Sequence, residues 1–339
     1  MKTCFFQSFV LSFCLCQSAG AETLTLFTWE AYLAPEIKNQ FETETGINIR
    51  ELHFSSDEGR NQLLWSGYPK YLDLVLMDSL SLRDKSWNEM FINLPADIRN
   101  NSNIDERFST RCGLSGAPYM WGGIGIAYRT SQITKPITSW KQLFDPEPAL
   151  KGRIAMMDDA YDNVSVALKS VGYSINTQNE DELRAAYRQL LHQRDYVARY
   201  ALSFDAIADA KVGPKIAAAM TYSGDYYVLK ERSPFKDWVY VTPEEGTALW
   251  MDCFAILKSS EHISAAQRFL NFLNRPDIAN RNGELLGFTP ALKTEKLSPT
   301  ITKNHISYPP VQQLSRSEFY DAQLAHDELR ISIYYAVKK

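Results

Sequence analysis

The sequence predicts an α/β protein of two lobes that are joined by more than one crossing strand. The length of 339 residues favours about two domains. Strand and helix patterns alternate directly after the N-terminal segment, and a second alternation occupies the middle of the chain. Alternation of this kind is typical of parallel sheets with right-handed crossovers, in which ligands bind at the carboxyl ends of the strands.

The first alternation contains four predicted strands. They are TLTLFTW (23–29), INIREL (47–52), YLDLVLM (71–77) and YMWGGIGIAY (119–128). Helices are expected over 34–45, which has a proline in its first turn and Gly46 just after its end, and over GRNQLLWSG. The third strand is almost continuously apolar, as in buried parallel sheets. Gly122 and Gly123 interrupt the fourth strand, which predicts a bend or a crossing between lobes there.

The second alternation has the same character. Its predicted strands are RIAMM (153–157), IAAAMTY (216–222), WVYVT (238–242) and ALWMDCFAIL (248–257). The helices expected around and after these strands are 162–172, 181–193, 264–274, 276–287 and 317–337. Both halves of the chain therefore indicate an α/β lobe.

The N-terminus predicts export. Lys2, the apolar run FFQSFVLSFCLC and the small residues 19–21 have the pattern of a secretory signal peptide over 1–21. A lipoprotein acylated at Cys14 or Cys16 is the alternative, although the residues before these cysteines have the wrong size. The rest of the chain is ordinary for a globular protein, with 45% hydrophobic residues, and its net charge of −4 does not favour a nucleic-acid partner.

The sequence offers no catalytic or metal-binding motif. The histidines lie far apart, and no GxSxG, HExxH or P-loop pattern is present, so we expect no enzyme activity, cofactor or metal. Removal of the signal peptide leaves Cys112 and Cys253. In an oxidising compartment these two either form one disulfide or remain separate buried thiols, and the sequence leaves both alternatives open.

The stretch ALWMDCFAIL places a charge inside an apolar strand. Trp250 and Asp252 are two positions apart, so both side chains point to one face of the strand. An unpaired carboxylate is costly to bury or shifts its pKa. A nearby Lys or Arg, a water-filled edge, or the positive charge of a ligand would each explain Asp252.

Aromatic and acidic residues recur where predicted strands end, in both halves of the chain. The candidate ligand-binding residues are Trp29, Glu30, Tyr32, Asp78, Asp159, Asp162, Tyr222, Trp250, Asp252, Phe288 and Tyr320. Taken singly, Asp78, Asp159 and Asp162 could instead cap helices, and Trp29 and Tyr222 could be core aromatics. No Lys or Arg stands at these positions, and rings with carboxylates attract ammonium groups and methylene chains. The pattern therefore predicts an aliphatic polyamine as the ligand.

The chain resembles the periplasmic polyamine-binding proteins of the PotD/PotF type over nearly its whole mature length. The matching stretches are LFTWEAYLAPEIKNQFETETGI, YLDLVLMDS, PYMWGGIGIAYR, ITSWKQLFDPEPALKGRIAMMDDAYD, ALWMDCFAIL, FLNFLNRPDIA and IYYAVKK. The resemblance implies a type II periplasmic-binding-protein fold with mixed sheets, a hinge and an interlobe cleft. We place 22–123 with 251–297 in lobe 1, and 124–250 with 298–339 in lobe 2.

The resemblance also carries site roles. It implies that Trp250 is an aromatic wall and that Asp252 is the central carboxylate, with Asp159 gripping an amine. The chain departs from the family at Glu30 and Asp78, where Thr or Ser is common, as well as at positions 222 and 320. Because the first two changes add acid, we hypothesise a preference for a triamine over a diamine.

Two roles follow from such a site. The protein would report norspermidine or spermidine to a membrane signalling receptor, a cyclic-di-GMP enzyme, as norspermidine-sensing relatives do. The alternative is delivery of the polyamine to an ABC permease. More remote alternatives are a ferric-ion-binding protein, suggested by Tyr226-Tyr227 and Tyr334-Tyr335, and an exported enzyme.

Overall fold

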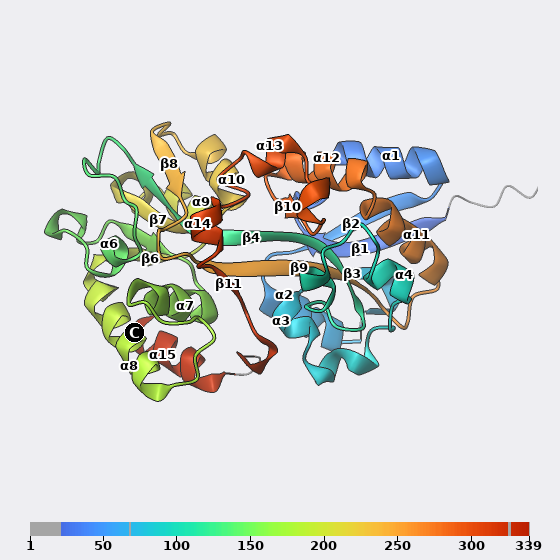
Figure 1. Cartoon of the computed structure of the whole chain (residues 1–339), viewed down its shortest axis with the longest axis horizontal. Coiled ribbons are helices and arrows are strands. Elements are labelled where there is room, and N and C mark those ends of the chain that lie inside the picture. The colour runs from blue at the N-terminus through green and yellow to red at the C-terminus, as the bar shows by residue number, and fades with distance from the viewer. Residues whose placement is uncertain (1–21, 68, 325–326, 339) are drawn as a thin grey trace, which may run out of the picture.

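The computed structural model describes residues 22–67, 69–324 and 327–338. The predicted signal peptide, 1–21, lies outside the described residues. Figure 1 shows two lobes along the long axis of the molecule, bridged by the strands β4 (Gly116–Arg129) and β9 (Ala248–Ile256). Both strands are buried along their length except at Trp250, as expected of strands that cross the centre of the protein.

The lobe that contains the N-terminal strands is a mixed sheet in the order β2-β1-β3-β9-β4. Its remaining strands are β1 (Thr23–Trp29), β2 (Asn48–Phe54), β3 (Leu74–Asp78) and β10 (Thr289–Pro290). β1 is parallel to β2 and β3, whereas β9 runs antiparallel to β3 and β4. The helices of this part of the chain are α1 (Pro35–Thr45), α2 (Asp57–Trp65), α3 (Ser79–Leu82), α4 (Ala96–Arg99), α5 (Glu106–Ser109), α11 (Ile263–Leu273), α12 (Pro276–Leu286) and α13 (Pro299–Thr302).

The other lobe is built on the second half of β4. Its strands are β5 (Ile154–Met156), β6 (Val197–Tyr200), β7 (Ala218–Tyr222) and β8 (Trp238–Val241). β7 and β8 pair antiparallel with β4, and β5 lies parallel between β6 and β7. Its helices are α6 (Lys141–Phe144), α7 (Ala160–Ser170), α8 (Glu180–Gln193), α9 (Ser203–Ala208), α10 (Asp225–Arg232), α14 (Val311–Leu314) and α15 (Glu328–Lys338).

β4 changes partners at the two glycines. Its residues up to Gly123 pair with β9, and its residues from Ile124 onward pair with β7. A Cβ atom at Gly122 would lie 2.6 Å from the ring of Trp250, so only glycine allows the indole to approach the strand this closely. The predicted crossing at this point is therefore observed, and β4 continues through it as one strand.

The protein has two large hydrophobic cores. One contains buried residues of 24–121 and 249–292, and the other contains buried residues of 124–248 and 320–337. The predicted lobe boundaries remain a prediction. The division of the cores agrees with them between 121 and 124 and near 249, whereas Tyr308, Leu314 and Phe319, which the prediction assigns to lobe 2, pack against the first core. Among the described residues, no helix is long and apolar enough to cross a membrane.

Cys112 and Cys253 form a disulfide, with their Cα atoms 5.9 Å apart. The bond joins the segment before β4 to β9, inside the first core. Of the two alternatives that the sequence left open, the structure therefore has the disulfide.

The predicted helix over 317–337 is wrong in its first half. Glu318–Phe319 form strand β11, which pairs with Ala248 and Leu249 of β9, and α15 begins only at Glu328. This pairing joins segments far apart in the chain, so a local pattern of apolar residues does not reveal it. The other predicted strands and helices are present, with their ends shifted by a few residues.

Candidate functional site

Asp252 of β9, one of the two strands that bridge the lobes, meets Tyr32. β9 carries the aspartate and the loop after β1 carries the tyrosine, whose hydroxyl donates a hydrogen bond to Asp252 Oδ2 at 2.7 Å. The backbone oxygen of Tyr32 accepts a bond from the Tyr119 hydroxyl, also at 2.7 Å, which fixes the loop on β4. Ala31 reaches this position with φ of 56°, which is uncommon for a residue with a side chain.

Asp252 is only 9% exposed, and its environment disfavours the charged form of its carboxyl. The pKa of Asp252 is raised to about 8, chiefly by burial. The charges of Asp57 and Asp78 also raise this pKa, while the Tyr32 hydroxyl and the charge of Arg60 act in the opposite direction. No Lys or Arg in the described parts of the chain forms an ion pair with Asp252. Asp252 therefore has a neutral hydrogen-bond donor as its partner and no direct ion pair within the described residues when it ionises.

A chain of aromatic rings begins at Tyr32, the hydrogen-bond partner of this carboxyl. The ring centroid of Phe288 lies 5.1 Å from the ring centroid of Tyr32 and 5.4 Å from that of Trp250. The ring centroid of Trp250 in turn lies 6.2 Å from that of Tyr222, which is the last residue of β7. These rings come from both lobes and form one contiguous aromatic surface, as the predicted site requires.

A second buried carboxyl lies in the first turn of α7. Asp162 accepts hydrogen bonds from the hydroxyls of Tyr222, at 2.5 Å, and Tyr320, at 2.6 Å. Burial raises the pKa of Asp162, against the effect of both hydroxyls. We refer to Tyr32, Asp162, Tyr222, Trp250, Asp252, Phe288 and Tyr320 as the acidic–aromatic cluster, because these contacts connect them.

Asp159 caps α7, which was the alternative to a binding role. Its Oδ1 accepts the backbone N–H of Asp162 at 2.8 Å. Burial, followed by the charge of Asp162, raises the pKa of Asp159 to about 7. Capping and ligand binding do not exclude one another, because a carboxylate can accept several hydrogen bonds.

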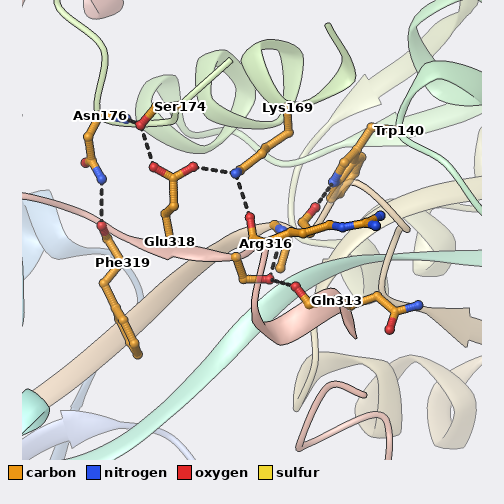
Figure 2. Close-up of polar contacts among 11 residues, drawn as sticks. Trp140, Lys169, Ser174, Asn176, Gln313, Arg316, Glu318 and Phe319 are labelled. Carbon is orange, nitrogen blue, oxygen red and sulfur yellow. Dashed lines mark hydrogen bonds and ion pairs between the residues drawn. The ribbon is translucent and has the colours of Figure 1, made fainter. Parts of the chain in front are cut away.

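Tyr320 is held by the short strand β11 and by side chains from both lobes. Figure 2 shows Glu318 between Lys169 and Ser174, and Asn176 Nδ2 donating to the backbone oxygen of Phe319. The backbone oxygen of Tyr320 accepts a bond of 2.8 Å from Arg83 Nη2, next to α3. The segment that carries Tyr320 is therefore tied to the surroundings of both α7 and α3.

Besides Asp159, three predicted site residues lie outside the acidic–aromatic cluster. Trp29 packs on Phe54 with ring centroids 4.4 Å apart. Glu30 is exposed and forms no hydrogen bond or ion pair within the described residues. Asp78 caps α3 by accepting the N–H of Ser81 at 2.7 Å, which was its alternative role.

Asp78 adds an acid to the sequence, but an arginine of α2 is paired with it in the structure. Arg60 Nη2 lies 3.3 Å from Asp78 Oδ2, so an internal guanidinium offsets this carboxylate. Asp78 still stands directly opposite Asp252 in the β3–β9 register. Like charges at opposed positions repel one another, and the guanidinium reduces this repulsion.

The sequence analysis missed three charged residues near the cluster: Arg60, Asp57 and Asp225. Asp57 and Arg60 lie in the first turn of α2, and their i, i+3 spacing was the only signal. Asp225 begins α10, three residues after Tyr222. Burial raises the pKa of Asp225 to about 7. Burial is also the main cause of the raised pKa of Tyr32, to which the charge of Asp225 adds a smaller contribution.

The tandem tyrosines do not share a site. The Tyr226 hydroxyl donates to the backbone oxygen of Trp238, whereas Tyr334 donates to Asp158 and Tyr335 is exposed. Within residues 22–67, 69–324 and 327–338, no group of three or more His, Cys, Asp or Glu could hold a metal ion. Neither observation favours the ferric-ion alternative.

The fold and the central position of the cluster define a two-lobe periplasmic-binding protein. Solved structures agree with this fold. A spermidine/putrescine ABC transporter substrate-binding protein of Streptococcus pneumoniae has a TM-score of 0.77 at 22% identity, covering 94% of this chain and 100% of its own. An apo ferric ion-binding protein of Pasteurella haemolytica has a TM-score of 0.69 at 14% identity, covering 94% and 98%. At these identities the likeness concerns the fold alone.

The chain belongs to the bacterial extracellular solute-binding protein family, whose model matches residues 36–308. It is 31% identical over 328 residues to the norspermidine sensor of Vibrio cholerae, covering 96% of this chain and 91% of that protein. It is 30% identical over 326 residues to the spermidine/putrescine-binding periplasmic protein of Escherichia coli, covering 93% and 91%. The predicted fold class and the resemblance are thereby confirmed, and these relatives are binding proteins or a sensor.

Proposed function

We propose that this protein is a periplasmic receptor that binds norspermidine or spermidine at the acidic–aromatic cluster. The observation that carries the proposal is the state of Asp162 and Asp252. Both are buried, both accept tyrosine hydroxyls, and neither forms an ion pair with a Lys or Arg of the described chain. A ligand ammonium would supply the missing positive charge through charge-assisted hydrogen bonds.

The aromatic rings account for the remainder of a polyamine. Trp250 and Phe288 offer ring faces and edges to methylene segments, and ring faces attract ammonium groups by about 0.5–2 kcal/mol each. Asp162 lies on α7 and Asp252 on β9, so an elongated ligand would contact elements of both lobes. A ligand that contacts both lobes binds more tightly when the lobes are closed around it. Its binding therefore shifts the protein toward the closed arrangement.

The partner that we propose is a membrane signalling receptor, a cyclic-di-GMP enzyme. The similarity to the Vibrio cholerae norspermidine sensor over almost the whole chain supports this role. A second candidate role, delivery to an ABC permease, is favoured by the similarity to the Escherichia coli binding protein over almost the same length. Co-purification of the ligand-loaded protein with its membrane partner distinguishes the two roles.

Calorimetric titration with putrescine, spermidine and norspermidine tests the binding proposal. We expect saturable 1:1 binding by the wild type. Asp252→Ala should weaken it by about 2–5 kcal/mol, since the bound amine would lose its carboxylate partner. Asp181→Ala is the matched control, because the Asp181 side chain is 87% exposed on α8. Absence of polyamine binding by the wild type, or equal loss in both variants, would refute the proposal.

A further inference from the structure

Arg60 is a buried cation at the edge of the acidic–aromatic cluster. It is 1% exposed although it lies in the first turn of a surface helix, α2. Its Nη1 is 2.6 Å from Asp57 Oδ1, and its Nη2 is 3.3 Å from Asp78 Oδ2. Nη1 also donates to the backbone oxygen of Leu76 at 3.3 Å. The guanidinium is thus fixed between two carboxylates, and further polar atoms hold its orientation.

The position of Arg60 relates it to the proposed ligand. Its guanidinium carbon is 5.4 Å from the ring centroid of Phe54, and this ring packs on Trp29. One of its two acids, Asp78, stands opposite Asp252 across the β3–β9 pair. Arg60 is therefore paired with the last residue of β3, which stands opposite Asp252 of β9.

Asp57 and Asp78, the two acids paired with Arg60, interact electrostatically with the carboxyls of the acidic–aromatic cluster. Burial is the largest cause of the raised pKa of Asp162 and of Asp252, and the charge of Asp57 raises both further. The charge of Asp78 acts in the same way on Asp159 and Asp252. Carboxylates of both lobes are thus close enough to influence one another, and Arg60 is the cation fixed among them.

Asp57 and Asp78 are also accessible. Their side chains are 52% and 31% exposed, whereas Arg60 is enclosed. A ligand ammonium could reach either carboxylate if the guanidinium did not compensate it. Arg60 thus occupies the position at which an additional ammonium group of a longer ligand would otherwise pair with Asp57 and Asp78.

We propose that Arg60 acts as a built-in substitute for a ligand ammonium, which limits the number of amines that the site accepts and makes Arg60 a determinant of polyamine selectivity. This inference rests on the proposed polyamine function. It changes the expectation drawn from the acid at position 78. That acid does not raise the number of ligand charges required, because the chain supplies the cation itself.

The experiment compares the affinities for spermine, a tetramine, and putrescine, a diamine, by calorimetry at one ionic strength. Arg60→Gln releases Asp57 and Asp78, so we expect the ratio of spermine to putrescine affinity to rise by about tenfold, the value of one additional charge-assisted contact. Arg60→Lys keeps the charge and should leave the ratio near that of the wild type. The double variant Arg60→Gln/Asp78→Ser removes one positive and one negative charge. Its ratio of spermine to putrescine affinity should therefore return most of the way to the wild-type value.

Asp78→Ser tests the same inference if Arg60→Gln does not fold. Serine can still cap α3. Loss of the Asp78 carboxylate leaves Arg60 balanced by Asp57 alone, so the group no longer carries excess negative charge and the ratio of spermine to putrescine affinity should fall. A ratio unchanged in Asp78→Ser and in any folded Arg60→Gln would overturn the inference while the proposed function stands. A wild type that binds no polyamine would overturn both.

Discussion

The hydroxyl of Tyr32 donates to the carboxylate of Asp252 across a sequence separation of 220 residues. This hydrogen bond supplies a polar partner for the buried acid without neutralising it, so the ligand-free protein retains a carboxyl whose charged form is disfavoured. The ionised carboxyl of such a site is electrostatically unfavourable without a ligand, and a bound cation stabilises it. Its properties should depend on pH in a direction that the structure fixes.

We expect Asp252→Asn to stabilise the ligand-free protein at pH 8. The pKa of Asp252 is about 8 in the folded protein, well above the value of about 4 for an unfolded aspartate. Between these two values the folded state binds more protons than the unfolded state, so the contribution of Asp252 to stability is present at low pH and is lost as the pH rises toward 8. Urea unfolding of both proteins at pH 5 and pH 8 measures this difference.

The asparagine can still accept the Tyr32 hydrogen bond, so the variant isolates the charge. Asp181→Asn, at an exposed position, is the control and should unfold like the wild type at both pH values. An Asp252→Asn protein that is less stable than the wild type at pH 8 would contradict the raised pKa.

Polyamine binding should release protons below pH 8. An ammonium beside Asp252 or Asp159 favours the ionised carboxyl, so both pKa values, about 8 and about 7 in the free protein, fall when the ligand binds. Affinity should therefore decrease from pH 8 to pH 6, by up to about tenfold per pH unit for each proton released. Titration at pH 6.5 in two buffers of different ionisation enthalpy counts the protons, and identical heats in both buffers would exclude this coupling.

Tyr222→Phe and Tyr320→Phe should each weaken binding by about 1.5–3 kcal/mol, because each removes a hydrogen bond to the charged Asp162. Both rings remain, so the aromatic surface is preserved. Tyr173→Phe, which changes a partly exposed tyrosine that makes no hydrogen bond through its hydroxyl within the described residues, serves as the control. Calorimetry with norspermidine measures the three variants, and unchanged affinity in both cluster variants would show that Asp162 does not hold the ligand.

The sequence predicted the strands and the aromatic and acidic residues at their ends because these features are local. The apolar run of β9 and the i, i+2 spacing of Trp250 and Asp252 are visible in a short stretch of chain. The role of Tyr320 and the pairing of β11 were harder to predict because they depend on strands meeting from distant parts of the chain. The burial of Arg60 was missed for a related reason. An arginine in a polar helical turn looks solvent-exposed, and only the tertiary placement of Asp78 shows that the guanidinium points inward.

Replacement of both Cys112 and Cys253 by serine should lower the free energy of unfolding by about 2–5 kcal/mol, since the disulfide closes a long loop in the unfolded chain. Cys253 follows Asp252 on β9, so its side chain points to the opposite face of the strand. The lower free energy of unfolding should therefore be measurable by urea unfolding. The folded double variant should bind polyamine with nearly the affinity of the wild type. A single Cys253→Ser change that abolished binding, with the fold intact by circular dichroism, would instead mean that the disulfide fixes the position of Asp252 and that site and core are coupled through β9.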